Sequence, residues 1–440
     1  MSETAGDLPI LKRIATKQAR VAVIGLGYVG LPLAVEFARA GLRVSGIDVD
    51  TRKVESINAG RSYILDVPDD VASGLVAAGL LSATTDPAAL RLADVAIICV
   101  PTPLGKSRDP DISFIVAAAD EIIRYAHRDM LVVLESTTYP GTTDELLLPR
   151  IVSAGFQIGQ DFFLAFSPER VDPANPVYGV RNTPKVIGGV TPQCTAVAMA
   201  LYRTAVDHLV PVSSTRAAEM VKLLENTFRA VNIGLVNEMA VICSKLGLDV
   251  WEVIEAASTK PYGFMPFHPG PGLGGHCLPI DPLYLSWKLK ALRYSTRFIE
   301  LADDINTHMP DHVVDKVSDA LNTDRKAVNG ARVLILGVAY KRNVDDVRES
   351  PAFEIMQLLV ERGAEVSYHD PFVPHLVHKG FTRDSIDLDD AALSEADCVV
   401  IVTDHSSYDL SRVVAHAQLN VDTPNALRGV PAGRARIVKL

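Results

Sequence analysis

A glycine-rich turn near the N-terminus limits the possible folds more than any other feature of this sequence. The apolar run at residues 20–24 leads into residues 25–30, GLGYVG, and residues 31–40 have the composition of a helix. A second apolar run, residues 41–48, ends in an acid, Asp48. Strand, turn, helix and strand in this order form the first unit of a doubly wound parallel sheet. In that setting the GxGxxG spacing predicts that the turn binds a dinucleotide.

Each glycine of the turn has an expected task in holding such a cofactor. Gly25 permits the tight turn, Gly27 lets the pyrophosphate approach the backbone, and Gly30 lets the helix pack against the strand. The phosphates are expected at the helix N-terminus, where free N–H groups point outward. Asp48 can accept hydrogen bonds from the ribose hydroxyls and would repel a 2′-phosphate, so NAD is favoured over NADP although Arg52 lies close by. The cofactor-binding residues expected here are Gly25, Gly27, Tyr28, Val29, Gly30, Asp48 and Arg52.

The sequence divides into three regions by its hydrophobic spacing. Apolar runs alternate with helical segments in residues 1–212, give way to helical spacing in residues 213–311, and return in residues 312–440. Near-continuous apolar strands between helices are typical of parallel sheets with both faces covered. The sequence therefore predicts the α/β class, with two doubly wound Rossmann-like domains joined by a central helical domain that contains a long helix. The expected strands include residues 95–100, 131–135, 161–166, 185–188, 331–337, 364–368 and 398–402, and the expected central helices are residues 216–246, 249–258 and 281–308.

Hydroxyl side chains follow two of the expected strands. Thr102 comes after the strand at 95–100, and Thr137 after the strand at 131–135. Because ligands of such sheets lie beyond the carboxyl ends of the strands, we expect both threonines near the cofactor. The alternative is that they are ordinary turn or helix-cap residues.

The composition is that of a globular protein and argues against several classes of function. The chain has 440 residues, 48% of them hydrophobic and 22% charged, which fits two or three domains. A formal charge of -10 argues against binding to nucleic acid or to a membrane surface. Apolar runs stay short of the ~18 residues that cross a bilayer, and the N-terminus lacks the apolar core of a signal peptide. Five scattered cysteines without a CxxC pair indicate a reduced, cytoplasmic setting and no metal site.

Cys277 differs from the other four cysteines because it follows a loop with four glycines, residues 270–275. Glycines let a backbone pass close to a ligand, and a thiol there can attack a carbonyl when its thiolate is stabilised. A nicotinamide cofactor together with such a thiol predicts oxidation through an aldehyde and a thioester to a carboxylate. The adjacent His276 is a weak candidate for a base, since neighbouring side chains seldom point the same way. The remaining cysteines are expected to pack in the core: Cys99, Cys194, Cys243 and Cys398.

The long helix expected at 216–246 has a polar stripe. Lys222 and Asn226 stand one turn apart, and Arg229 continues the same stripe. A lysine and an amide on one face can hold an oxyanion or a catalytic water. A solvated helical face would have the same pattern, and this alternative stays open.

Two carboxylates are further candidates for acid–base chemistry. Glu169 follows the strand at 161–166 and can act as a base for water, although an ion pair with Arg170 or Arg181 is the alternative. Asp281 stands four residues after Cys277 and can orient the thiol, a lysine or a water.

The C-terminal region contains a second turn that differs from the first. Residues 337–341, GVAYK, have one glycine of the dinucleotide pattern, so a second dinucleotide is not expected. Tyr340 and Lys341 suit a nucleotide base and a phosphate, and Arg348 is a candidate contact for a phosphate or a carboxamide. An exposed loop of lysine and arginine is the alternative.

Three ordered motifs resemble those of the UDP-glucose/GDP-mannose dehydrogenase family along nearly the full chain. They are residues 23–32 (VIGLGYVGLP), residues 274–282 (GGHCLPIDP) and residues 339–351 (AYKRNVDDVRESP). The resemblance implies an NAD-dependent, four-electron oxidation of a nucleotide-sugar C6 alcohol to a uronic acid. It also implies a homodimer, or a larger assembly, built on the long central helix.

The resemblance assigns a role to each candidate residue. It implies that Cys277 forms a thiohemiacetal and then a thioester, which water activated near Glu169 and Asp281 hydrolyses. The expected catalytic residues are Cys277, Lys222, Asn226, Asp281, Glu169 and Thr137. Thr102, Thr137 and Arg348 are added to the cofactor contacts. The expected substrate contacts are Glu169, Arg170, Lys222, Asn226, Arg229, Tyr262, Gly274, Tyr340 and Lys341.

Two positions separate the branches of this family. Ile280 stands where members acting on UDP-glucose typically have a lysine, and Pro173 where they have a second glutamate. The run at 167–176 resembles instead the branch acting on N-acetylhexosamines. The resemblance favours UDP-N-acetylglucosamine as the substrate, with UDP-N-acetylmannosamine, UDP-N-acetylgalactosamine and UDP-glucose as alternatives.

Two other classes of function compete with this interpretation. A two-electron dehydrogenase of the 6-phosphogluconate type shares the cofactor domain and the Lys–Asn pair, but needs neither Cys277 nor residues 331–440. A non-catalytic nucleotide-sugar binder is expected to have lost Cys277, Lys222 or Asp281, and all three are present.

Overall fold

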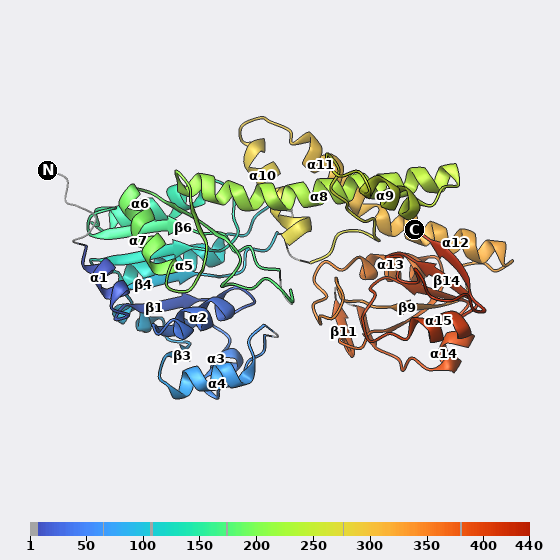
Figure 1. The fold of residues 1–440 in the computed structure, drawn as a ribbon, viewed down its shortest axis with the longest axis horizontal. Helices are drawn as coiled ribbons and strands as arrows, with labels where there is room; N and C mark the ends of the chain where they lie inside the picture. Colours follow the sequence, from blue (N-terminus) through green and yellow to red (C-terminus); the bar gives the residue numbers. More distant parts are fainter. Residues whose placement is uncertain (1–7, 65, 106–108, 173–174, 276, 379–380) are drawn as a thin grey trace. The chain divides into compact units, whose positions relative to one another are not determined.

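The computed structural model describes residues 8–440 apart from 65, 106–108, 173–174, 276 and 379–380. It divides into two compact units, Met1–Glu225 and Asn226–Leu440 (Figure 1). The domain boundaries expected at residues 212 and 311 stay a prediction. Among the described residues, no helix combines the length and the apolar character needed to cross a membrane.

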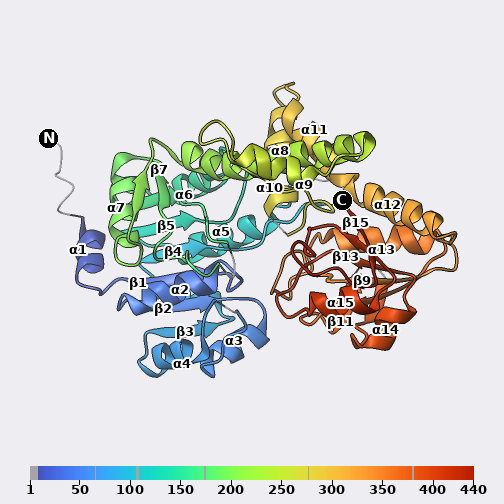
Figure 2. The ribbon, with the colours of Figure 1, turned by 45° about the vertical axis from the view of Figure 1, so that its right-hand side comes forward.

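The first unit is built on an eight-stranded sheet in the order β3-β2-β1-β4-β5-β6-β7-β8. Its part from β3 through β2, β1 and β4 to β5 can be followed in Figure 2. The run from β3 to β6 is parallel and has the strand order of a Rossmann fold. Its strands are β1 (Arg20–Ile24), β2 (Arg43–Ile47), β3 (Leu81–Thr84), β4 (Val95–Ile98), β5 (Met130–Leu134), β6 (Phe162–Phe166), β7 (Lys185–Gly189) and β8 (Leu209–Pro211).

Strand β7 corrects the expectation of a wholly parallel sheet, because it pairs antiparallel with β6 and parallel with β8. The sequence hides this reversal. A strand buried on both faces is a continuous apolar run whichever way it points. All five residues of β7 are buried.

Helices cover both faces of this sheet, and successive strand residues enter two different cores. In β4, Val95 and Ile97 pack in the core with Phe37, while Ala96 and Ile98 pack in the other core. The helices are α1 (Pro9–Ala15), α2 (Gly30–Arg39), α3 (Thr51–Asn58), α4 (Asp69–Ala77), α5 (Ser113–Tyr125), α6 (Leu148–Ser153) and α7 (Pro192–Tyr202), with a 3-10 turn η1 (Pro87–Leu92) and a π-helical turn η2 (Thr143–Leu147).

The helical region that follows confirms the long helix and corrects the last one. Helix α8 (Thr215–Leu246) matches the expected segment at 216–246. The segment at 281–308 was expected to be one helix but forms two, α10 (Cys277–Lys290) and α11 (Arg297–Thr307). Arg293, in the left-handed region with φ 56°, lies in the break, where neither glycine nor proline signals it. The other helices are α9 (Val250–Ser258) and α12 (Met309–Thr323).

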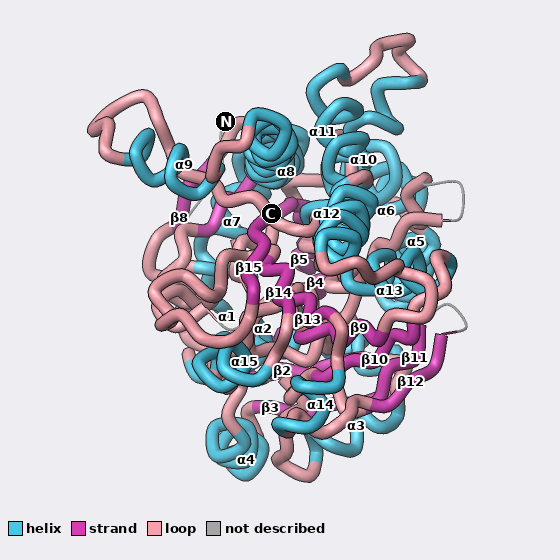
Figure 3. The backbone as a smooth tube through the Cα atoms, turned by 90° about the vertical axis from the view of Figure 1, so that its right-hand side faces the viewer, coloured by secondary structure: helices cyan, strands magenta, loops and turns pink. Residues whose placement is uncertain are grey.

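The second unit contains a five-stranded parallel sheet in the order β10-β9-β13-β14-β15 (Figure 3). Three of its strands were predicted: β9 (Arg332–Leu336), β10 (Glu365–His369) and β13 (Cys398–Ile401). The sequence analysis missed β14 (Leu419–Asp422) and β15 (Arg436–Lys439), as it missed β3 and β8 in the first unit. Helices α13 (Pro351–Glu361), α14 (Asp390–Glu395) and α15 (Leu410–His416) complete the unit, with a hairpin of β11 (His375–His378) and β12 (Phe381–Asp384).

Candidate active site

The glycine turn between β1 and α2 has the shape that a dinucleotide requires. A Cβ built on Gly25, whose φ is +92°, would lie 2.5 Å from the carbonyl oxygen of Cys99. A Cβ on Gly30 would lie 1.8 Å from the carbonyl oxygen of Gly25, so neither position can take a side chain. At Gly27 nothing lies within 4 Å of such a Cβ. The open space beside Gly27 is where a pyrophosphate can reach the backbone, so the turn fits NAD.

Asp48, directly after β2, is buried against this turn. Its carboxylate accepts hydrogen bonds from the N–H of Leu26 at 2.8 Å and of Asp50 at 2.9 Å, and Lys53 Nζ lies 3.1 Å away. The sequence analysis missed Lys53, whose spacing of five residues from Asp48 was the available signal. Arg52 was expected to act near Asp48, but its guanidinium binds Asp50 at 3.0 and 2.8 Å. This hydrogen-bonded ion pair lowers the pKa of Asp50 to about 2.

The strand ends that carry the two threonines lie side by side. Strands β4 and β5 are neighbours, and Ser136 Oγ donates to the carbonyl oxygen of Val100 at 2.8 Å. Thr102 is buried and Thr137 is half-buried. The structure therefore brings both threonines to the carboxyl edge of the sheet.

A buried ionic network lies at the same edge. Lys185 Nζ is 2.8 Å from Glu135 Oε2 and 3.3 Å from Glu169 Oε2. The hydroxyl of Tyr202 donates to Glu135 Oε1. Burial opposes the charge of Lys185, but the two carboxylates outweigh burial and raise the pKa of Lys185. For the carboxyl group of Glu135, burial has the opposite effect and raises the pKa.

Glu169 has a different partner from either alternative that the sequence offered. Its side chain pairs with Lys185, whereas Arg170 binds Glu225 and Arg181 binds Asp207. Burial alone would raise the pKa of Glu169, but Lys185 and the backbone N–H groups that its carboxylate accepts hold that pKa below its usual range. Glu169 is therefore held as an anion.

Segment 169–170 also holds the first half of α8. Lys222 Nζ donates to the carbonyl oxygen of Glu169 at 2.5 Å. One turn further, the guanidinium of Arg170 forms two hydrogen bonds to the Glu225 carboxylate, at 3.2 and 2.5 Å. Arg170, expected among the substrate contacts, is thus engaged with α8.

Glu219, which the sequence analysis did not select, fixes the start of α8 to the segment after Thr137. Its buried carboxylate accepts the N–H of Gly141 at 2.5 Å, and the N–H and hydroxyl of Thr143 at 2.9 and 2.7 Å. Burial raises the pKa of Glu219 to about 7. An acid among apolar residues at the start of the long helix was the signal that could have identified Glu219.

The second unit holds the candidate nucleophile. Cys277 is exposed and is the first residue of α10, where free backbone N–H groups favour a thiolate. Asp281 lies one turn further along α10, and its Oδ2 accepts a 2.5 Å hydrogen bond from Asn226 Nδ2. The structure therefore brings Asn226 and Asp281 together. Arg229 and Tyr262 are exposed, and His276 and Pro173 lie outside the described residues.

The glycine loop before Cys277 packs against the C-terminal motif. A Cβ on Gly274 would lie 2.7 Å from Cβ of Tyr340, and one on Gly275 would lie 2.8 Å from its ring. The N–H of Gly275 donates to the carbonyl oxygen of Arg348 at 2.9 Å. Lys341 Nζ lies 5.8 Å from the centre of the Tyr340 ring. The loop and the motif thus form one packed piece, and Arg348 directs its guanidinium to Asp346 at 2.6 Å.

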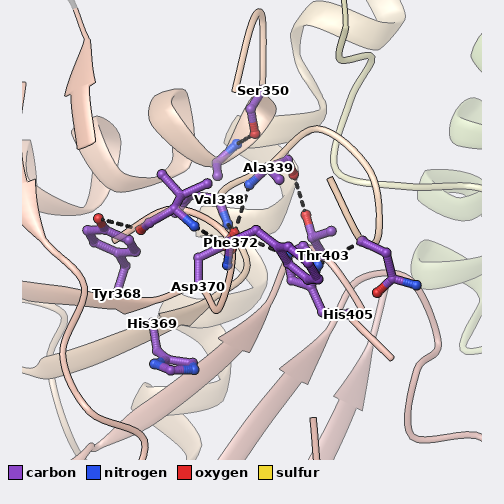
Figure 4. A network of polar contacts seen from close by, with 12 residues as sticks. Val338, Ala339, Ser350, Tyr368, His369, Asp370, Phe372, Thr403 and His405 are labelled. Carbon is purple, nitrogen blue, oxygen red and sulfur yellow. Dashed lines mark hydrogen bonds and ion pairs between the residues drawn. The ribbon is translucent and has the colours of Figure 1, made fainter. Parts of the chain in front are cut away.

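Asp370 organises the turn after β9, and it does so with both oxygens (Figure 4). Oδ2 accepts the N–H of Val338 at 2.7 Å and of Ala339 at 3.0 Å, and His405 Nε2 lies 3.0 Å away. Oδ1 accepts the N–H of Phe372 at 2.8 Å. Burial opposes ionisation, but these donors lower the pKa of Asp370. Asp370 therefore fixes the backbone of the turn at Val338 and Ala339.

Comparison with known proteins defines the class. Residues 19–206 match an NAD binding domain, residues 216–308 a central domain and residues 334–429 a UDP binding domain of one family. The protein is an NAD-dependent nucleotide-sugar dehydrogenase. The chain belongs to the UDP-glucose/GDP-mannose dehydrogenase family, as its three motifs predicted.

Relatives of the chain differ in the sugar that they are named for. An NDP-N-acetyl-D-galactosaminuronic acid dehydrogenase of Ralstonia nicotianae is 37% identical over 88% of this chain and 91% of the relative. A UDP-N-acetyl-D-glucosamine 6-dehydrogenase of Pseudomonas aeruginosa is 38% identical over 81% and 84%. The solved UDP-D-ManNAc dehydrogenase of Pyrococcus horikoshii has a TM-score of 0.87 and 34% identity, covering 96% and 98%. These names confirm the N-acetylhexosamine branch.

Replacing Glu219 by glutamine should flatten the pH dependence of stability. A pKa raised from 4.5 to about 7 means that the folded state binds the extra proton, so stability falls as pH rises from about 5 to about 7. That loss, on the order of 3 kcal/mol, should be absent in Glu219→Gln. Urea unfolding at about pH 5 and about pH 7.5 measures it, with Glu252→Gln, an exposed glutamate, as control. The same change in the free energy of unfolding between the two pH values in the wild type and both variants would contradict this prediction.

Proposed function

We propose that this protein oxidises the C6 alcohol of a UDP-N-acetylhexosamine to the carboxylate, with UDP-N-acetylglucosamine as preferred substrate. The observation that carries the proposal is Cys277, exposed at the start of α10 and one turn from Asp281, in a chain that uses NAD. A two-electron alcohol dehydrogenase has no use for such a thiol.

The thiol divides a difficult oxidation into two similar steps. NAD, when bound, supplies the acceptor for each hydride. Loss of a hydride and a proton turns the alcohol into an aldehyde, and the Cys277 sulfur then bonds to the carbonyl carbon while the oxygen takes a proton. Loss of a second hydride and proton from this thiohemiacetal leaves a thioester. Water then adds, the C–S bond breaks, and the carboxylate and the thiol are released.

The polar residues described above suit particular tasks in this sequence. We assign Lys222 and Asn226, one turn apart on α8, to the oxyanions that form during addition and hydrolysis. Asp281, hydrogen-bonded to Asn226, orients that amide. Glu169 is held as an anion, which suits it to orient the hydrolytic water. Thr137 is assigned to the reacting centre from its place at the end of β5.

The choice of substrate rests on the branch and on one position. Ile280, buried on α10, replaces the lysine typical of members that act on UDP-glucose. The named relatives act on three N-acetylhexosamine epimers or their products, which supports the N-acetylated class. The remaining proposed substrate contacts are Arg170, Arg229, Tyr262, Gly274, Tyr340 and Lys341. The proposed cofactor contacts are Gly25, Gly27, Tyr28, Val29, Gly30, Asp48, Arg52, Thr102, Thr137 and Arg348.

We also assign this enzyme to the cytoplasm as a homodimer. Within the described residues none of its five cysteines forms a disulfide, and four of them are buried, which suits a reducing compartment. The exposed side chains of Phe228, Leu235, Ile242 and Leu246 recur at intervals of seven or four residues, so they form one apolar stripe along α8. A second copy of the helix is the proposed cover for this stripe.

Two NADH should form for each UDP-N-acetylglucosamine consumed, because alcohol and thiohemiacetal each lose one hydride. Purified protein would be incubated with NAD and UDP-N-acetylglucosamine, UDP-N-acetylmannosamine, UDP-N-acetylgalactosamine or UDP-glucose in parallel, and NADH absorbance compared with sugar consumed. Preference for another epimer would overturn the substrate assignment alone. One NADH per sugar would overturn the four-electron reaction.

Cys277→Ser should stop carboxylate formation while permitting the first oxidation. A serine hydroxyl adds to the aldehyde far less readily than a thiolate, so turnover should fall by about 1,000-fold or more. Mass spectrometry of the products, with an aldehyde-trapping hydrazine present, would detect the first intermediate. Cys243→Ala, which alters a buried cysteine of α8, is the control. Carboxylate formed at the wild-type rate by Cys277→Ser would rule out the covalent route.

Leu235→Asp should convert the dimer into a monomer. The substitution places a charge in the middle of the apolar stripe, where burial of a carboxylate is unfavourable. Light scattering after size-exclusion chromatography measures the mass, and Leu92→Asp, which changes an exposed leucine of η1, is the matched control. An unchanged mass for Leu235→Asp would place the interface elsewhere.

A further inference from the structure

We propose that the buried pair Glu135–Lys185 is a positioning device that fixes Glu169 and, through its carbonyl oxygen, Lys222. The inference rests on the proposed function, because it gives Glu169 and Lys222 tasks at the thioester. Neither Glu135 nor Lys185 was selected from the sequence. Neither is assigned to contact substrate or cofactor, so both act through their neighbours.

The reversed strand β7 makes this pair possible. Glu135 directly follows β5, and Glu169 lies just after β6, so both stand at the carboxyl edge of the parallel strands. Lys185 is the first residue of β7. Because β7 runs antiparallel to β6, its first residue lies at that same edge. In a wholly parallel sheet, Lys185 would stand at the opposite edge.

Burial gives the pair its strength and its cost. Lys185 is 4% exposed, Glu135 1% and Glu169 8%, so an uncompensated charge here would be strongly unfavourable. Lys185 Nζ contacts one oxygen of each carboxylate, at 2.8 Å for Glu135 and 3.3 Å for Glu169. Tyr202 donates to the other oxygen of Glu135. The ammonium is therefore held between two carboxyl groups that are themselves fixed by other contacts.

The contacts of Glu169 leave its carboxylate little freedom. Oε1 accepts the N–H of Arg170 at 2.8 Å and of Val171 at 2.7 Å, while Oε2 faces Lys185. Lys185 Nζ also lies 3.4 Å from the carbonyl oxygen of Pro168, which fixes the preceding peptide. A peptide held on both sides presents its own carbonyl oxygen in one direction. That oxygen is the 2.5 Å acceptor of Lys222 Nζ.

Loss of the Lys185 charge should therefore have two separable effects. Lys222 should lose its fixed position, which slows the steps that form an oxyanion. The pKa of Glu169 should rise, so the acidic limb of the pH–rate profile should move to higher pH. The charged or titratable groups that act on Glu169 are Lys185, Glu135, Lys222, Tyr202 and Cys99.

The decisive variant removes both charges of the pair. Lys185→Met alone leaves two buried carboxylates and is expected to unfold, whereas Lys185→Met/Glu135→Gln leaves the site without that conflict. We expect the double variant to bind NAD like the wild type, with kcat about 100-fold lower and the acidic limb shifted upward. Lys185→Arg should recover most of the rate. The control is Arg181→Met/Asp207→Asn, which removes an exposed ion pair of the same unit.

Two readouts test this inference, and the second does not depend on the proposed function. Rapid quenching followed by intact-protein mass spectrometry should show the Cys277 thioester accumulating in the double variant. Wild-type kcat and pH profile in that variant would overturn the inference. The second readout is a pair of crystal structures, of the wild type and of the double variant, and it needs no substrate. A Lys222–Glu169 hydrogen bond that persists in the double variant would overturn the inference whatever the enzyme oxidises, and one that is lost would support it.

Discussion

In both α/β units, a backbone carbonyl of a neighbouring strand end fills the space beside the first glycine of a turn. The carbonyl oxygen of Cys99 lies where a side chain of Gly25 would be, and that of Thr403 lies 2.5 Å from a Cβ built on Gly337. In each unit an acid after the second strand then accepts an N–H of the turn, Asp48 in one and Asp370 in the other. The two turns therefore share one packing arrangement. The two turns differ where a ligand would approach, since Ala339 stands where the first turn has the open Gly27.

The reversed strand β7 adds a buried cation to the carboxyl edge of the first sheet. Parallel strands alone bring Thr102, Thr137 and Glu169 to this edge. The antiparallel β7 adds Lys185, and its charge lets two carboxylates persist in a buried setting. Helix α8 then docks on the segment that Lys185 holds, through Lys222. The direction of β7 thus places Lys185, Lys185 holds the segment at Glu169, and this segment holds Lys222, the cation assigned to the oxyanion.

The sequence predicted local structure correctly where a residue type is required, or excluded, for a single physical reason. The turn at 25–30 predicted its own backbone geometry, and the proline-free run at 216–246 predicted α8 within one residue. The direction of β7 could not be predicted, because a strand buried on both faces has the same composition in either direction. The place of Lys185 at the carboxyl edge, which follows from that direction, was therefore not predicted. Strand β14 was missed because it carries a buried aspartate, Asp422, a residue type depleted in strands. Its carboxylate is satisfied by N–H groups of the following turn, a contact that only the folded chain reveals.

The close packing of Gly274 and Gly275 on Tyr340 limits how the amino-acid sequence of such enzymes can change. The loop that presents the thiol has no room to vary unless the aromatic residue of the C-terminal motif varies with it. A glycine loop that fits a different aromatic residue would therefore not pack here if it were moved alone. The unit from Asn226 to Leu440 contains both partners, so a change in the glycine loop can be matched by a change in the C-terminal motif of the same unit.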